Sequence, residues 1–115
     1  MTDNCLFCRI VRRELPAKIV AETSECVAFR DVNPQAPVHV LVIPKRHVAS
    51  LDSASDGDAE LLGRMWLLAA QVARDENIAD TGYRTVVNTN AGAGQTVFHV
   101  HAHVLGGRRM GWPPG

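Results

Sequence analysis

The sequence lacks an excess of charge of either sign. Its 115 residues include twelve lysines and arginines and twelve aspartates and glutamates, so the formal net charge at pH 7 is zero. Proteins that bind nucleic acid through bulk electrostatics carry a broad basic surface, and this composition argues against one. A small anionic ligand bound by a few local groups stays compatible with the sequence.

Long hydrophobic runs are missing and cysteine is scarce. No apolar run approaches the ~20 residues that span a membrane. The N-terminal MTDNCLFCRI has no basic region followed by an apolar core, as a secretory signal would. Three cysteines, an odd number, do not indicate a disulfide scaffold. We therefore expect a cytoplasmic protein without a membrane partner, folded as one domain over residues 1–115 with a tail from about 106 to 115.

Hydrophobic patterning predicts an α+β fold. A long helix is expected over 58–76, with one apolar face formed by Leu61, Leu62, Met65, Trp66, Leu68, Ala69, Val72 and Ala73. A short helix is expected within 4–13, and strands are expected over 19–22, 25–31, 38–44, 84–88 and 97–105. Because few connections are long enough for parallel pairing, we predict an antiparallel five-stranded sheet with helices on one face.

Three of the five histidines alternate in the stretch HVHAHV. In a strand, His99, His101 and His103 would line one face, roughly 6.6–6.8 Å apart. The residues between them would point toward the helices, namely Phe98, Val100, Ala102 and Val104. Three imidazoles in a row coordinate one metal ion poorly, but each acts as an acid, a base or a nucleophile near neutral pH. The spacing indicates a track of separate groups along a ligand.

A loop rich in small residues, NAGAGQT at 90–96, precedes the histidines. No lysine follows its glycines, so it is not a Walker A motif, and it does not match G-x-G-x-x-G. Two interpretations stay open for this loop. It is either a flexible turn or an anion-binding loop, since glycines let backbone N–H groups approach an anion closely.

Cys5 and Cys8 form a C-x-x-C motif at the start of the short helix. Alone, this motif fits a redox pair, half of a zinc site or two buried thiols. No βαβ context suggests thioredoxin, and zinc needs four nitrogen or sulfur ligands. Cys26 has no partner in sequence and is predicted to be a buried core thiol. His39 alternates into a strand and is predicted to be structural.

The segment GQTVFHVHAHVLGG closely resembles the histidine triad motif of the HIT superfamily. The segments CLFCRIVRRELPAKIVAE, AFRDVNPQAPVHVLVIPKRH, VVNTNAG and GGRRMGWPPG are similar to the Hint branch, the histidine triad nucleotide-binding proteins. The resemblance covers nearly the whole chain. It implies a HIT-like fold with one long and one short helix, and a homodimer that forms a larger continuous sheet. The implied activity is a nucleotidyl hydrolase acting on purine nucleoside phosphoramidates and related AMP conjugates.

The resemblance also assigns catalytic roles. His101 matches the nucleophile that attacks the α-phosphate and forms a covalent nucleotidyl-histidine, which water then hydrolyses. His103 matches the residue that contacts the phosphate and helps to manage protons. Thr96 stands where many relatives have serine, and its hydroxyl keeps the capacity to donate to the leaving nitrogen. Trp112 lies in a tail that, in Hint relatives, reaches toward the other subunit's active site.

Further contacts with an AMP-type substrate follow from the same resemblance. Asp31 and Val32 match the ribose and base pocket, where a carboxylate accepts hydrogen bonds from ribose hydroxyls. Asn88 matches a residue that contacts phosphate or ribose. A surface acid and a turn-forming asparagine are the alternatives at Asp31 and Asn88. The loop that holds the phosphate matches Gly94, Gln95 and Thr96.

Many bacterial-type HIT proteins carry the C-x-x-C motif together with two histidines and bind zinc there. The matching residues in this sequence are Cys5, Cys8, His47 and His99. A closed site of this kind would be structural and would tie the N-terminus beneath the triad strand.

Three rival functions remain. A dinucleoside polyphosphate hydrolase of the Fhit type shares the triad, but the WPPG end and the C-x-x-C segment speak against it. A galactose-1-phosphate uridylyltransferase-like enzyme typically has Gln at the third triad position, where this chain has His103. The third rival is a nucleotide- or zinc-binding adaptor whose catalysis is incidental.

Overall fold

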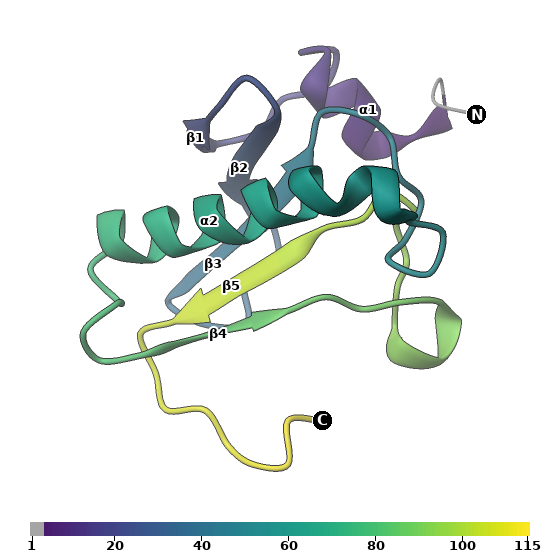
Figure 1. Cartoon of the computed structure of the whole chain (residues 1–115). Helices are drawn as coiled ribbons and strands as arrows, with labels where there is room; N and C mark the ends of the chain where they lie inside the picture. Colours follow the sequence, from purple (N-terminus) through teal and green to yellow (C-terminus); the bar gives the residue numbers. More distant parts are fainter. Residues whose placement is uncertain (1–3) are drawn as a thin grey trace.

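The computed structural model describes residues 4–115, which form one antiparallel five-stranded sheet and two α-helices (Figure 1). The elements in chain order are α1 (Leu6–Val11), β1 (Ile19–Glu22), β2 (Cys26–Arg30), β3 (Val38–Pro44), the 3-10 turn η2 (Asp56–Asp58), α2 (Ala59–Asp75), β4 (Tyr83–Val86), the 3-10 turn η3 (Ala91–Ala93) and β5 (Ala102–Gly106). The predicted α+β class and the antiparallel sheet are confirmed.

The strands lie in the order β1-β2-β3-β5-β4. The chain crosses the sheet through α2 and forms the edge strand β4, and β5 then returns between β4 and β3 (Figure 1). In the β3–β5 pair, Leu41 lies opposite His103 and His39 lies opposite Leu105. Residues two apart on a strand share a face, so His39 and His103 are diagonal neighbours on one face of the sheet.

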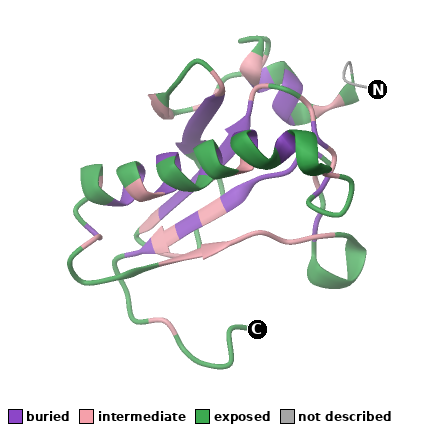
Figure 2. Cartoon of the chain, in the orientation of Figure 1, coloured by how far each residue is buried: buried purple, intermediate pink, exposed green. Residues whose placement is uncertain are grey.

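Both faces of the sheet are covered by helices, because the central strands are apolar on both sides. In β2, Cys26 and Ala28 belong to the core under α2, whereas Val27 and Phe29 pack with residues of α1. Strand β3 is buried along almost its whole length (Figure 2). The prediction that the helices share one face is therefore wrong. A strand with apolar residues on both faces needs a cover on each.

Helix α2 buries one stripe of its surface and exposes the rest (Figure 2). Of the predicted apolar face, Leu61, Met65, Leu68, Ala69, Val72 and Ala73 are buried. Trp66 is 45% exposed, so its assignment to the buried face was wrong. Trp66 follows Met65 by about 100° of rotation around the helix, which turns it away from the sheet. Among residues 4–115, no helix has the length and apolar character needed to cross a membrane.

The last strand is shorter than its sequence pattern suggests. We expect a strand over 97–105, but β5 begins at Ala102, which pairs with Val42. Before that point the chain leaves β3, and Val100 N–H donates to Val48 O at 2.7 Å. His99 and His101 thus precede the strand, and Phe98 is 47% exposed rather than packed on a helix. Alternation continues even so, since Val100, Ala102 and Val104 lie in the core under α2.

Two glycines, Gly106 and Gly107, form the transition from β5 to the C-terminal tail. Gly106 is the last residue of the strand, and a Cβ there would lie 2.6 Å from Ile78 Cδ1. Gly107 has a φ of 89°, a conformation that favours glycine. This pair of glycines is required by packing and by backbone conformation. The tail beyond it is mostly exposed, and Trp112 has 82% of its surface accessible.

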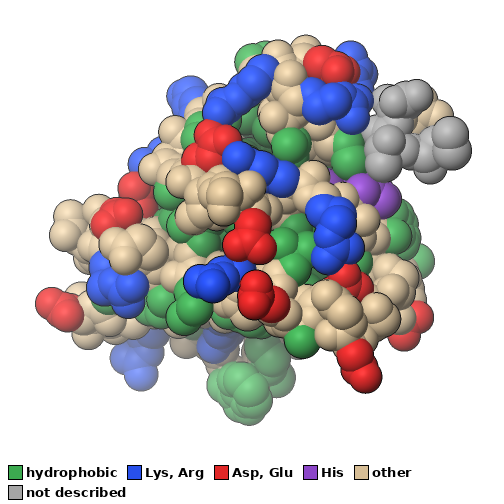
Figure 3. Space-filling model, turned by 45° about the horizontal axis from the view of Figure 1, so that its top comes forward, with side chains coloured by type: hydrophobic (Ala, Val, Ile, Leu, Met, Phe, Trp, Pro, Cys, Tyr) green, Lys and Arg blue, Asp and Glu red, His purple; other side chains and the backbone are tan. Residues whose placement is uncertain are grey.

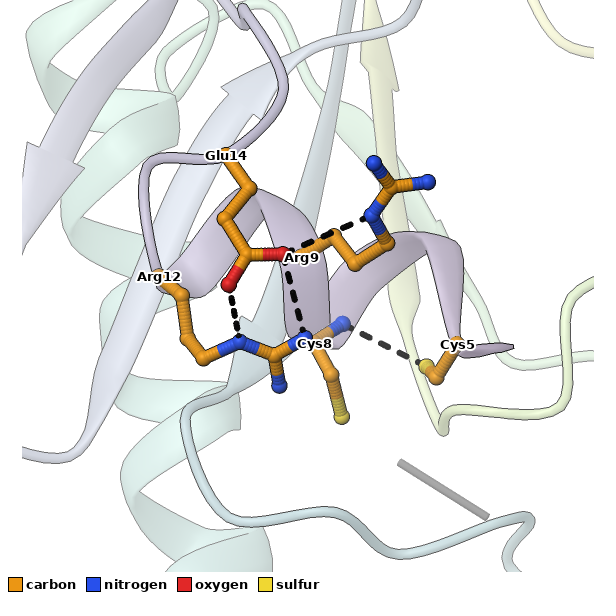
Figure 4. Close-up of polar contacts among 5 residues, drawn as sticks. All are labelled: Cys5, Cys8, Arg9, Arg12 and Glu14. Carbon is orange, nitrogen blue, oxygen red and sulfur yellow. Dashed lines mark hydrogen bonds and ion pairs between the residues drawn. The ribbon is translucent and has the colours of Figure 1, made fainter. Parts of the chain in front are cut away.

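Charged side chains of both signs are interspersed on the face shown in Figure 3. Glu14 lies between two arginines of the first helical segment, with its carboxylate 3.5 Å from Arg9 Nε and 2.7 Å from Arg12 Nε (Figure 4). Exposed pairs of this kind add little to stability, because solvent screens them. Their main effect is to cancel charge locally.

Candidate functional site

A cavity of about 310 Å³ lies on the side of the sheet that α1 covers. Its apolar walls include Phe7, Ile10, Phe29 and Leu41. Five residues predicted to bind or transform the substrate also line it, namely Asp31, Val32, Thr96, His101 and His103. Its volume lies at the lower end of the range for small-molecule sites, which are typically apolar with a few polar groups that fix orientation.

His101 is held in a single tautomer by its own chain. The side chain is buried, and Nδ1 lies 2.8 Å from the backbone oxygen of His99. A carbonyl oxygen only accepts hydrogen bonds, so in neutral His101 the proton sits on Nδ1 and Nε2 carries the lone pair. The ring of Phe7 packs edge-on against the imidazole at a centroid distance of 5.1 Å. Nε2 thus belongs to a fixed ring in the wall of the cavity.

His103 accepts a hydrogen bond from His39 on the neighbouring strand β3. His39 Nδ1 accepts from Gln35 N–H at 3.0 Å, so in neutral His39 the proton sits on Nε2. His39 Nε2 lies 2.9 Å from His103 Nδ1 and 3.4 Å from Asp31 Oδ2. His103 Nδ1 therefore accepts, and the proton of neutral His103 sits on Nε2. In their neutral forms the two histidines of the cavity present opposite groups, a lone pair on His101 and an N–H on His103.

Burial keeps His103 and His39 neutral. Desolvation, together with the nearby His101 and His39 rings, lowers the pKa of His103 to about 4. Desolvation also lowers the pKa of His39, although the Asp31 carboxylate opposes the shift. At neutral pH, His103 is consequently an uncharged donor.

The four residues predicted as metal ligands lie together at the start of α1, where Figure 4 shows the sulfur atoms of Cys5 and Cys8. His99 Nδ1 lies 3.3 Å from Cys5 Sγ, 3.4 Å from Cys8 Sγ and 3.2 Å from His47 Nδ1. Cys8 Sγ lies 3.3 Å from His47 Nδ1. Bonds of about 2.0 Å to nitrogen and 2.3 Å to sulfur give tetrahedral edges of about 3.3 Å between two nitrogens, about 3.5 Å between nitrogen and sulfur and about 3.8 Å between two sulfurs. The spacing of these four atoms, called here the four-ligand cluster, fits one tetrahedral ion.

Hydrogen bonding around the four-ligand cluster also suits a cation. His99 Nε2 donates to Pro44 O at 2.7 Å, which leaves its Nδ1 lone pair directed at the cluster. Cys8 N–H donates to Cys5 Sγ at 3.3 Å. Burial and the adjacent Cys5 thiol raise the pKa of Cys8 to about 11, so a bound cation is required to hold it as a thiolate. The chemistry of the donor set and its geometry both fit a metal ion.

A family model described as the HIT domain matches residues 12–110. The chain belongs to the HIT family. This match confirms the resemblance of the triad segment to the superfamily. An uncharacterised HIT-like protein of Synechocystis sp. (strain ATCC 27184 / PCC 6803 / Kazusa) is 53% identical over 115 residues, which are 100% of both chains.

Solved structures give the same assignment. A HIT family hydrolase from Legionella pneumophila is 50% identical with a TM-score of 0.95, and the match covers 97% of this chain and 100% of that one. A histidine triad nucleotide-binding protein from Candida albicans is 31% identical with a TM-score of 0.81, covering 96% of this chain and 83% of that one. The HIT fold is thus shared across bacterial and fungal relatives.

Four predicted binding residues of this HIT protein do not line the cavity, namely Asn88, Gly94, Gln95 and Trp112. Asn88 lies just beyond β4, and Gly94 N–H donates to Ala91 O at 3.0 Å. The side chain of Gln95 is buried and bonded within the chain. Trp112 lies with its ring 5.9 Å from the Arg84 guanidinium carbon.

Sequence reasoning underestimated His39 and did not single out Phe7 as a contact of His101. His39 is indeed buried in β3, but it also donates to His103. Alternation in VHVLVIP puts His39 on the same face as Leu41. Only the β3–β5 register, which the sequence does not give, places His39 diagonally beside His103 on that face of the sheet.

Proposed function

We propose that this HIT protein is a nucleotidyl hydrolase of the Hint branch that acts on purine nucleoside phosphoramidates and related AMP conjugates. The observation that carries the proposal is the His101 tautomer, fixed by the 2.8 Å bond from Nδ1 to His99 O. It leaves an unprotonated Nε2 in a cavity lined by both apolar and polar side chains. The hydrolase and nucleotide-binding names of the Legionella and Candida relatives support the same assignment.

The reaction follows in two steps. His101 Nε2 attacks the α-phosphorus, a nitrogen–phosphorus bond to the protein forms, and the bond to the leaving amine breaks. The departing nitrogen takes a proton from the Thr96 hydroxyl. Water then attacks the phosphorus, His101 Nε2 leaves, and the proton lost by water restores the donor. The products are the free amine and AMP, so atoms and protons balance with one water consumed.

The other cavity residues bind and orient the substrate. His103 donates its Nε2 proton to a phosphate oxygen, and the His39 donor keeps that proton on Nε2. Asp31 accepts from ribose hydroxyls with lone pairs that its contacts to Asn33 and His39 leave available. Val32, with its side chain fully exposed, borders the base, and Asn88 contacts phosphate or ribose.

We also propose that the four-ligand cluster binds one zinc ion. Cys5, Cys8, His47 and His99 would supply four ligands and leave no open position. Bound zinc would act as a structural cross-link, which joins α1 to the segments around His47 and His99. Nothing in the hydrolytic steps requires it.

A homodimer completes the proposal. Strand β4 is an edge of the sheet, and Tyr83 on it is 38% exposed. Pairing of two β4 edges would satisfy their free backbone groups and produce a larger continuous sheet. The tail that carries Trp112 leaves the sheet close to β4 (Figure 1). In a dimer of this kind, Trp112 would lie near the partner's nucleotide site and help to shape the pocket for the leaving amine.

Steady-state kinetics test the proposed activity. The kcat/KM for adenosine 5′-phosphoramidate is compared with that for a diadenosine polyphosphate, and mass spectrometry detects the nucleotidyl-protein adduct. We expect the phosphoramidate to be the better substrate and the adduct to map to His101. A preference for the diadenosine compound would instead assign a Fhit-type activity. Negligible turnover in both the wild type and a His101 variant would favour an adaptor.

A further inference from the structure

Gln95 is the one buried glutamine among residues 4–115, and its amide bonds entirely within the chain. Its Oε1 accepts from Asn90 N–H at 2.8 Å. Its Nε2 donates to Ala49 O at 2.9 Å and to Val97 O at 3.1 Å. An amide nitrogen has two hydrogens, so both are used and none is left for a ligand.

These bonds close the loop that precedes the triad. Asn90 has a φ of 66° and Gly94 a φ of 88°, which bend the backbone at both ends of η3. Gln95 N–H donates to Asn90 O at 3.1 Å, so backbone and side chain of Gln95 both bind Asn90. The next residue, Thr96, lines the cavity together with His101. The side chain of Gln95 thus fixes the loop from which Thr96 enters the site.

The bond from Gln95 to Ala49 fastens the loop to a second anchored segment. Ala49 follows Val48, whose carbonyl accepts from Val100 N–H at 2.7 Å, between the first two triad histidines. His47, one residue earlier, belongs to the four-ligand cluster. The residues 47–49 therefore join three parts of the site, and Gln95 is the side chain that connects them to the loop.

We propose that Gln95 is a positioning residue for phosphate binding: it fixes the loop at 90–96 against residues 47–49 and does not touch the substrate. The proposal rests on the proposed function, since it assumes that the loop faces the phosphate of an AMP-type ligand. A variant without the amide keeps the adenosine pocket, whose walls come from α1, β2 and β3. It loses the fixed position of Thr96 and its neighbours.

The test compares the affinities of AMP and adenosine, which differ by the phosphate. Gln95→Met preserves length and removes all three side-chain hydrogen bonds, and Gln95→Asn is a milder variant too short to reach both Asn90 and Ala49. Gln71→Met is the matched control on the exposed side of α2. For Gln95→Met we expect the Kd of AMP to rise at least about tenfold and that of adenosine by less than about twofold. The KM for adenosine 5′-phosphoramidate should rise in parallel.

Amide hydrogen exchange of the ligand-free protein separates positioning from contact. We expect exchange in residues 90–96 of Gln95→Met to accelerate at least about tenfold, with the central strands unchanged. An unchanged AMP affinity in a folded variant overturns the proposal. Weaker AMP binding with unchanged loop exchange also overturns it, because Gln95 would then contact the phosphate directly. Loss of the fold in both Gln95 variants would assign the residue a global structural role instead. If the wild-type protein binds no AMP, the proposed function itself fails.

Discussion

The four-ligand cluster and the cavity next to it each contain a histidine of the triad, and the two imidazoles are hydrogen-bonded through opposite ring nitrogens. His99 donates from Nε2 to Pro44 O and directs Nδ1 at two thiols and a second imidazole. His101, two residues later, donates from Nδ1 to His99 O and keeps Nε2 for the cavity. The carbonyl that each ring meets decides which nitrogen stays free, and so separates the proposed metal ligand from the proposed nucleophile.

The two regions are also connected. His99 contributes its side chain to the four-ligand cluster and its carbonyl oxygen to His101. His99 therefore links the cluster to His101, and Phe7 in the cavity wall packs edge-on against both imidazoles, at centroid distances of 6.0 Å and 5.1 Å. Substitutions of the polar cavity residues should change rates and leave the fold, whereas substitutions in the cluster should lower stability and, through His99, also disturb His101.

The largest effect is expected from His101→Asn. Removal of the nucleophilic Nε2 should lower kcat at least about 10³-fold and abolish the covalent adduct. The Kd of AMP should change only a few-fold, because the phosphate and base contacts remain. Single-turnover kinetics and binding calorimetry measure the two quantities. Near wild-type turnover in this variant would contradict the mechanism.

Cys8→Ser tests the cluster. Protein purified without chelator should contain about one zinc per chain, and the variant should lose it along with on the order of 4–5 kcal/mol of unfolding free energy. Cys26→Ser is the matched control, since Cys26 is a buried thiol outside the cluster. Elemental analysis and urea denaturation check the outcome. Full zinc content in Cys8→Ser, or none in the wild type, would count against the site.

His39→Leu should reduce kcat by about 10–100-fold, because His103 loses the donor that keeps its proton on Nε2. His39→Gln keeps an N–H near the same position and should recover part of the rate. Zinc content should be unchanged in both variants, which distinguishes this pair from a cluster substitution. Equal kcat values for the leucine and glutamine variants would show that donation to His103 is unimportant.

The pH dependence of stability should report the burial of His103. Its pKa in the folded chain is about 4, below the ordinary value of about 6.5, so between these values the unfolded chain takes up a proton that the folded chain does not. The contribution of His103 is complete above pH 6.5 and is lost as the pH falls toward 4. Because the side chain is part-exposed, we expect wild type to lose on the order of 1–2 kcal/mol more than His103→Asn between pH 7 and pH 4.5.

Urea denaturation of both proteins at the two pH values measures the difference. Any release of metal at low pH affects both alike and cancels. An identical loss of stability in the two proteins would show that His103 is not desolvated in the folded chain.

The smallest effect on stability is expected from removal of the tail. Deletion of residues 110–115 takes away the exposed Trp112 and little packing, so the unfolding free energy should change by less than about 0.5 kcal/mol. Relative rates across a panel of phosphoramidates with different amines should nevertheless change. Constant rate ratios would contradict a role for Trp112 in substrate choice, and a large loss of stability would attribute any rate change to unfolding.

Much of this protein follows from its sequence alone. Alternating and helical apolar patterns predict the antiparallel sheet and α2, because these periods depend on local backbone geometry. The HVHAHV stretch identifies the family, and the four proposed zinc ligands are recognisable by their resemblance to other HIT proteins. The periodic patterns and the triad depend on residues close together in sequence, and the four ligands are recognised by matching residue types to other HIT proteins. Neither requires knowledge of the folded chain.

The tertiary structure decided the rest. The β3–β5 register brings His39 to His103 across 64 residues of sequence, and the cluster brings Cys5 to His99 across 94. Only the folded chain shows that α1 and α2 cover opposite faces of the sheet. Which ring nitrogen is free depends on a carbonyl oxygen at a particular position in space. A hydrogen bond depends on distance and direction, and no pattern of residue types along the chain specifies either across such separations.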